Sequence, residues 1–289
     1  IKQVTLSTTL ATNVIAQSNY PPVGLILIPG PGLNPDLYNY NFPYQTVSGS
    51  IDHRGRETRA LDRREVKQAV NKLIDTGVKQ IGVCGKFATR NPDQEQEIKE
   101  LITKQFPTIT QITASHHLTG ELNFPRRAAT TYLNCIVEST HQKFSTAIKQ
   151  GLEQLDITAP IYLLKADGGT IPLAKSQEQP IITANSGPAA SIMGIMSADL
   201  PTTTPIGLDI GGTTTDISLF VNQKPLFKPD GIKIKNYQTL VRGLYNVSVP
   251  CGGDSIVQIE DDQLKVGPVR QGPAAAFGGG QPTPTDALV

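Results

Sequence analysis

A short stretch in the last third of the chain combines strand-forming residues with side chains that can do chemistry. PIGLDIGGTTTDISLF (205–220) predicts two strands joined by a Gly-Gly turn, with Asp209 before the turn and Asp216 after it. Glycines lack a Cβ atom, so the backbone can bend tightly and aim several amide hydrogens into one concavity that binds an anion. The candidate phosphate-binding residues of this turn are Gly211, Gly212, Thr213 and Thr214.

The two acids make chemical sense beside a phosphate if a divalent cation lies between them. Mg²⁺ commonly takes one or two carboxylates together with waters and phosphate oxygens. Both acids are candidate catalytic residues; we expect Asp209 to bind the metal and Asp216 to brace the hairpin. The sequence contains no Walker-type G-x-x-x-x-G-K-[ST] loop. A plain hairpin turn with two capping acids explains the same residues.

Three more clusters of glycine and polar residues mark this half of the chain. ADGGT (166–170) and CGGDS (251–255) lie at strand boundaries, and NSGPAAS (185–191) begins a predicted helix, with Ser186 as its cap. A helix N-terminus is a natural anion site. Each cluster also has an ordinary interpretation as a turn or a cap. The candidate nucleotide-binding residues of the clusters are Ser186, Gly187, Gly252 and Gly253.

The elements that must position these clusters alternate between strands and helices. Apolar runs and periodicity predict strands at 24–28, 79–87 and 107–115, and helices at 61–77, 91–106, 125–155 and 186–200. Residues 29–50 are rich in Pro, Asn, Tyr and Gly and predict an irregular surface excursion. Residues 254–267 predict a further hairpin that turns at EDDQ. Strands and helices in this order, with short connections, indicate an α/β layer.

Composition excludes several classes of protein. The chain has 289 residues, of which 38% are hydrophobic, enough for two lobes with cores of their own. A net charge of +1 without a basic stripe predicts no nucleic-acid partner. No apolar run reaches ~18 residues, so no membrane span is expected. Three widely separated cysteines predict a cytoplasmic location, and the four histidines are expected to be surface or structural residues.

The motifs, taken in order, resemble the hydantoinase A/5-oxoprolinase family of the actin–hexokinase–Hsp70 ATPase superfamily. STTLATNVI (7–15) resembles the family's G-T-T-x-A-T-N-A segment, and RRAATTYLNCIV (126–137) resembles its E-R-x-x-T-T-x-L-N-A-Y-V helix. LDIGGTTTDISL is similar to its D-x-G-G-T-S-T-D-V-x-L motif. ADGG, SGPAAS, CGGDSI and residues 264–289 resemble further family segments.

This resemblance implies a two-lobed α/β fold of the actin-like (ribonuclease H-like) ATPase class, with mixed sheets. It implies an N-terminal lobe portion, 1–124, and a hydantoinase A-like lobe, 125–289. The implied cofactors are ATP and Mg²⁺, and the implied substrate is a small cyclic amide or carbonyl compound whose oxygen is phosphorylated. A hydantoinase B-like second subunit and an oligomeric assembly are the implied partners.

The resemblance also implies roles for individual residues. Gly211, Gly212 and Thr213 would hold the β- and γ-phosphates, Asp209 would orient Mg²⁺ through water, and Asp216 would brace the hairpin. Gly252 and Gly253 would approach the nucleoside. The residues implied on the facing lobe are Thr8, Thr9 and Asn13.

The chain also departs from the family pattern. The family has a first D-x-G-G-T-x-T-D hairpin upstream of its G-T-T segment, and the printed sequence begins after that point. Either that hairpin lies upstream or the protein lacks one of the two phosphate-binding hairpins. For the chain alone we expect little or no ATP turnover. Leu6-Ser7 stands for the family's H-G, Arg126 for its Glu, and Asp254 for a third glycine. Two alternatives stay open: a nucleotide-binding regulatory subunit with weak catalysis, and a sugar-kinase-like phosphotransferase.

Overall fold

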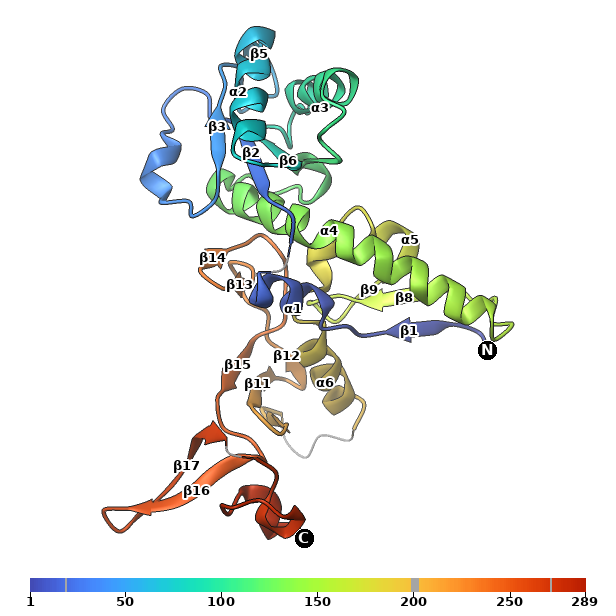
Figure 1. The fold of residues 1–289 in the computed structure, drawn as a ribbon, viewed down its shortest axis with the longest axis vertical. Helices are drawn as coiled ribbons and strands as arrows, with labels where there is room; N and C mark the ends of the chain where they lie inside the picture. The colour runs from blue at the N-terminus through green and yellow to red at the C-terminus, as the bar shows by residue number, and fades with distance from the viewer. Residues whose placement is uncertain (19, 199–202, 271) are drawn as a thin grey trace. The chain divides into compact units, whose positions relative to one another are not determined.

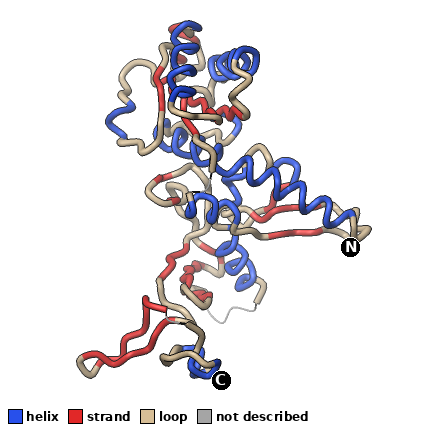
Figure 2. Tube along the Cα trace, viewed as in Figure 1, coloured by secondary structure: helices blue, strands red, loops and turns tan. Residues whose placement is uncertain are grey.

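The computed structural model describes residues 1–18, 20–198, 203–270 and 272–289. The chain divides into two compact units. Unit 1 comprises Ile1–Ser186 and Pro229–Gly243, and unit 2 comprises Gly187–Lys228 and Leu244–Val289. Both units contain helices and strands (Figure 1 and Figure 2).

Unit 1 is built on a parallel sheet of four strands in the order β3-β2-β6-β7. These strands are β2 (Val23–Ile28), β3 (Tyr44–Thr46), β6 (Gln80–Gly85) and β7 (Gln111–Ala114). Every residue of β2 and β6 is buried, as expected of parallel strands with both faces covered. The strands predicted at 24–28, 79–87 and 107–115 are therefore confirmed.

The predicted irregular excursion over residues 29–50 is wrong in part. Tyr44–Thr46 form β3, which pairs in parallel with β2. The rest of this region contains the 3₁₀ turn η1 (Pro35–Tyr38) and the first residue of β4 (Ser50–Ile51), which pairs with β5 (Glu57–Arg59). β3 was missed because a three-residue edge strand carries little pattern of its own and is fixed by the neighbouring strand.

Helices cover both faces of the sheet in unit 1 (Figure 1). They are α2 (Arg63–Asp75), α3 (Asp93–Gln105) and the 30-residue α4 (Phe124–Glu153). Ile26 and Ile28 pack into one core with α2 and α3, whereas Leu25 and Leu27 face the core that includes α4. This alternation follows from the two-residue period of a strand. The helices predicted at 61–77, 91–106 and 125–155 are confirmed.

One glycine lets α4 approach the sheet. A Cβ atom at Gly82 would lie 2.3 Å from Leu25 Cδ2 and 2.8 Å from Thr131 Cγ2.

At the start of α2, the Asp62 carboxylate accepts a hydrogen bond from the Arg64 amide at 2.8 Å and caps the helix.

The remainder of unit 1 consists of short elements. They are β1 (Val4–Leu6), α1 (Leu10–Gln17), η2 (Ser115–His117), β8 (Ile161–Leu164), β9 (Thr170–Pro172), α5 (Leu173–Ser176), η3 (Pro180–Thr183), β13 (Lys233–Ile234) and β14 (Tyr237–Gln238). β1 pairs in parallel with β8, which pairs antiparallel with β9. Within the described ranges, no helix has both the length and the apolar character needed to cross a bilayer.

Unit 2 carries the hairpin predicted from residues 205–220. Its elements are α6 (Ser186–Met196, less its first residue), β10 (Ile206–Ile210), β11 (Thr215–Val221), β12 (Lys224–Pro225), β15 (Asn246–Val249), β16 (Ser255–Glu260), β17 (Gln263–Arg270), η4 (Ala275–Phe277) and η5 (Pro284–Ala287). β10 and β11 form the predicted hairpin, and β16 and β17 form the second one. The helix predicted at 186–200 ends at Met196, and its expected last residues, Asp199 and Leu200, lie outside the described residues.

Candidate functional site

The β10–β11 ladder places the two candidate acids directly opposite each other. Asp209 is the register partner of Asp216, and Gly207 is the partner of Ser218. Residues opposite each other in a ladder put their side chains on the same face. That face is turned toward α6, since a Cβ atom at Gly207 would lie 2.7 Å from Ile195 Cδ1.

Two neighbours that the sequence did not single out contact this acidic pair. The Ser191 hydroxyl, on α6, donates a hydrogen bond to Asp209 Oδ2. Lys228 is close enough to Asp216 for their charges to interact: partial burial lowers the pKa of the Lys228 ammonium, and the Asp216 carboxylate opposes that shift. Like charges facing each other across a ladder are destabilising. The hydroxyl and the ammonium offset part of this repulsion, and a bound cation would offset more.

The turn between the strands exposes part of its backbone. The Gly211 amide donates to the Thr214 carbonyl at 2.9 Å and closes the turn. The expectation that the Gly211 amide points into an anion-binding concavity is therefore wrong, because this donor is used inside the hairpin. Gly212 and Thr213 are exposed, and no hydrogen bond from their amides is found within the described part of the chain. These two amides are available to an anion.

The loop before β16 braces the turn from outside. The Gly253 amide donates to the Gly211 carbonyl and the Asp254 amide donates to the Gly212 carbonyl, each at 2.8 Å. A Cβ atom at Gly252 would lie 2.4 Å from the Gly211 carbonyl oxygen, so only glycine allows this approach. Gly252 and Gly253 thus hold the hairpin, and their predicted contact with a nucleoside stays a prediction.

Asp254 occupies the position of the family's third glycine. Its carboxylate forms an ion pair with Arg270 at 2.7 Å. A Cβ atom at Gly212 would lie 2.7 Å from Asp254 Oδ2, so this carboxylate packs against the turn. Arg270 offsets the negative charge that Asp254 brings to a candidate phosphate site.

Ser186 is used differently from the predicted helix cap. The structure begins α6 at Ser186, after Asn185 in the left-handed region (φ 60°). The Ser186 hydroxyl donates to the Thr8 carbonyl at 2.8 Å and accepts from the Thr8 amide at 3.1 Å. These hydrogen bonds connect the STTLATNVI segment (7–15) to Ser186, the last residue of the segment Ile1–Ser186 of unit 1. The predicted roles of Ser186, Gly187, Thr9 and Asn13 toward a nucleotide stay predictions.

The residues of the hairpin fit a phosphate–Mg²⁺ ligand. Two carboxylates face each other below a turn with two open amides, and Thr213 and Thr214 add hydroxyl groups. Across the described residues, no group of three or more His, Cys, Asp and Glu side chains could hold a metal ion. Mg²⁺ does not need such a group, because it commonly takes one or two carboxylates and completes its shell with water and phosphate oxygens.

Comparison with known families decides where this chain belongs. The family model described as hydantoinase/oxoprolinase matches residues 127–289, and the model of the N-terminal region of that family matches residues 1–106. The chain belongs to the hydantoinase/oxoprolinase family. The predicted boundary between 1–124 and 125–289 stays a prediction.

Three relatives illustrate the range of this family. The chain is 26% identical over 259 residues to the acetophenone carboxylase gamma subunit of Aromatoleum aromaticum, covering 84% of this chain and 35% of that protein. It is 24% identical over 344 residues to 5-oxoprolinase of Saccharomyces cerevisiae, covering 99% of this chain and 26% of that protein. Among solved structures, the ATP-dependent caprolactamase from Pseudomonas jessenii matches with a TM-score of 0.76 and 24% identity, over 97% of this chain and 44% of that one.

The structural match confirms the fold class. The chain has the mixed α/β fold of that caprolactamase, as the predicted actin-like class requires. The chain spans less than half the length of each of these three relatives. Activity, substrate and partners of the whole protein are therefore matters for proposal.

Proposed function

We propose that this chain carries the phosphate-binding hairpin of an ATP-dependent enzyme that activates the oxygen of a carbonyl or cyclic amide by phosphorylation. The observation that carries the proposal is the braced turn, whose exposed Gly212 and Thr213 amides lie at the tip of a ladder with Asp209 and Asp216 face to face. The names of the relatives support it, since they include an oxoprolinase and an ATP-dependent caprolactamase.

Each residue has a role that follows from its position. The amides of Gly212 and Thr213 bind phosphate oxygens, and the hydroxyl groups of Thr213 and Thr214 add donors without adding charge. Asp209 holds the hydration shell of Mg²⁺, while the Ser191 hydroxyl fixes one of its carboxylate oxygens. Mg²⁺–ATP supplies the phosphoryl group and neutralises charge when bound. Preorganised donors contribute most to phosphoryl transfer, because this chemistry depends on positioning and charge stabilisation.

Lys228 completes the electrostatics of the site. Its ammonium is close enough to the Asp216 carboxylate for the two charges to interact, which leaves Asp209 as the acid committed to the cation. Gly252 and Gly253 keep the turn in place, so the two open amides stay aligned.

The wider setting follows from the same family. We propose a small cyclic amide or carbonyl substrate, a hydantoinase B-like second subunit and an oligomeric assembly. All three cysteines are free, and Cys84 and Cys135 are buried, in keeping with a reducing cytoplasm.

Calorimetric titration of Mg²⁺–ATP onto the chain tests the proposal. Asp209→Asn should weaken binding by about tenfold or more, the loss expected when about 1.4 kcal/mol or more of interaction is removed. Asp216→Asn should weaken binding less. Asp262→Asn, in the exposed turn between β16 and β17, is the matched control and should leave affinity unchanged. Equal losses, or a greater loss for Asp216→Asn, would contradict the assigned roles, and absence of wild-type binding would contradict the site.

The same titration, followed by assays of the assembled enzyme, separates the alternatives. Substrate-stimulated ADP release with a cyclic amide supports the enzyme. Nucleotide binding without turnover in the full assembly would favour a regulatory subunit instead. Phosphorylation of a sugar would favour a sugar-kinase-like phosphotransferase.

A further inference from the structure

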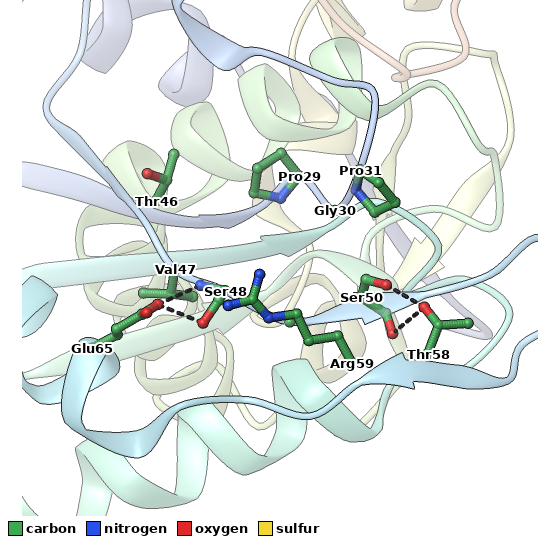
Figure 3. A pocket seen from close by; sticks show the side chains of 11 residues that line it. Pro29, Gly30, Pro31, Thr46, Val47, Ser48, Ser50, Thr58, Arg59 and Glu65 are labelled. Atoms are coloured by element: carbon green, nitrogen blue, oxygen red, sulfur yellow. Dashed lines mark hydrogen bonds between the residues drawn. The ribbon is translucent and has the colours of Figure 1, made fainter.

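A pocket of unit 1 lies at the carboxyl ends of β2 and β3 (Figure 3). Its volume is about 530 Å³, within the range of small-molecule sites. Its lining includes Pro29, Val47, Ser48, Arg59 and Glu65.

The topology of the sheet favours a ligand at this edge. The strand order is β3-β2-β6-β7, so the chain passes from β2 to a neighbour on one side and later returns to β6 on the other side. The order of strands therefore reverses between β2 and β6. In open α/β sheets, ligands bind beyond the carboxyl ends of the strands near such a reversal, and this pocket lies one strand to the side of it, at the ends of β2 and β3. The pocket wall is fixed there, because Lys86 Nζ, after β6, donates to the Pro31 carbonyl at 2.8 Å.

One side of the pocket presents a carboxylate. Glu65 Oε2 accepts hydrogen bonds from the Ser48 amide at 2.7 Å and the Ser48 hydroxyl at 2.6 Å (Figure 3). These two donors hold the pKa of Glu65 below its ordinary value, so the group is ionised at neutral pH. Both donors use Oε2. The other oxygen, Oε1, has no hydrogen-bond partner among the described residues and can accept from a ligand.

The other charge of the pocket is the Arg59 guanidinium, which points toward the Ser48–Glu65 pair in Figure 3. Its charge acts on the Glu65 carboxylate, but within the described ranges the guanidinium forms no ion pair or hydrogen bond, so its donors are available to a ligand. The Ser50 and Thr58 hydroxyls are hydrogen-bonded to each other nearby. Pro29, Pro31 and Val47 supply apolar surface. The charged side chains of the lining thus sum to zero, with one acceptor and one donor group facing the same space.

We propose that this pocket binds a small amino-acid-like zwitterion. Its carboxylate pairs with the Arg59 guanidinium in a two-point contact that arginine favours. Its ammonium group donates to Glu65 Oε1, and its aliphatic part lies against Pro29 and Val47. A ligand with only one charge would leave Arg59 or Glu65 unpaired, and a polyanion such as a nucleotide would be repelled by Glu65.

The source of such a ligand follows from chemistry if the proposed function holds. Hydrolysis of a cyclic amide adds water across the C–N bond and leaves a carboxylate and an ammonium group at the two ends of one chain. The pocket would then bind the ring-opened compound. This assignment of source rests on the proposed function, whereas the zwitterion site rests only on unit 1.

Calorimetry on the full chain with ω-amino acids from glycine to 6-aminohexanoate tests the site. The tightest binder is then compared with the carboxylic acid and the amine of the same length, each of which should bind roughly tenfold more weakly or worse. Arg59→Gln and Glu65→Gln should each cause a similar loss. Arg64→Gln, an exposed arginine of α2 outside the pocket, is the matched control and should bind like the wild type.

The outcomes are decisive in both directions. Equal binding of the zwitterion and its single-charge analogues would overturn the proposal, as would wild-type affinity in both pocket variants or no binding at millimolar ligand. Thermal melting shows whether the variants fold, and Arg59 is exposed, so its replacement should be tolerated. Mg²⁺–ATP titration of Arg59→Gln should match the wild type, so failure of this site is distinguishable from failure of the hairpin site.

Discussion

Replacement of Gly252 by alanine should disrupt the candidate phosphate site without changing the residues whose amides are proposed to bind phosphate. The new Cβ atom would lie 2.4 Å from the Gly211 carbonyl oxygen and 2.7 Å from the carbonyl carbon and oxygen of Gly212. All three are backbone atoms of the turn, so no side-chain rotation relieves the clash. Either the turn or the loop at 251–254 must move.

The size of the effect follows from two contributions. Overpacking of this kind costs about 1–3 kcal/mol. Movement also breaks the hydrogen bonds from the Gly253 and Asp254 amides, each 2.8 Å long, and a net loss of about 1 kcal/mol for each is typical. We expect the free energy of unfolding of unit 2 to fall by about 3–5 kcal/mol. Displacement of the Gly212 and Thr213 amides should weaken Mg²⁺–ATP binding by about tenfold or more.

Hydrogen exchange of peptides from residues 205–221 reports local stability, and calorimetry reports affinity. Gly280→Ala is the matched control, because no atom lies within 4 Å of the position of its new Cβ atom. The reasoning is refuted if Gly252→Ala changes stability by no more than about 0.5 kcal/mol, the usual range for a neutral surface substitution, and leaves affinity unchanged.

Two further predictions concern buried polar groups of unit 1. Arg127→Met should lower the free energy of unfolding by about 3 kcal/mol or more, because the fully buried guanidinium donates to the Ser115 hydroxyl at 3.0 Å and to several backbone carbonyls. A denaturant midpoint close to that of the wild type would contradict this. Burial lowers the pKa of His141 to about 4. Between about pH 6.5 and 4 this histidine is therefore protonated in the unfolded chain and neutral in the folded chain, so the free energy of unfolding decreases as the pH falls through this window. Urea unfolding at several pH values should show this slope in the wild type and a smaller one in His141→Gln, and identical slopes would count against it.

The hairpin was predictable because its information is local. Acid, glycine and threonine stand within eight residues, and strand alternation flanks them, so Asp209 and Asp216 could be placed at either side of a turn from the sequence alone. The sequence could not tell which amides point outward. That depends on the hydrogen bond from Gly211 to Thr214 and on the loop at 251–254, which is 40 residues away in the chain.

The features that escaped prediction depend on contacts between distant segments. The Glu95 carboxylate is fully buried and accepts from the Gly85 amide at 2.7 Å, the Ser115 hydroxyl at 2.5 Å and the His116 amide at 3.0 Å. Its donors come from the ends of β6 and β7, and no spacing in the sequence links them. His116 is a structural residue, as expected, because its ring bonds to Glu95 at 2.6 Å.

The most direct test of the central claim is a crystal structure of this chain with Mg²⁺ and a non-hydrolysable ATP analogue. We predict that phosphate oxygens lie within hydrogen-bond distance of the Gly212 and Thr213 amides and that the metal lies on the side of Asp209, with water between them. A nucleotide bound elsewhere on the chain, with the turn at 211–214 free of phosphate, would contradict the assignment.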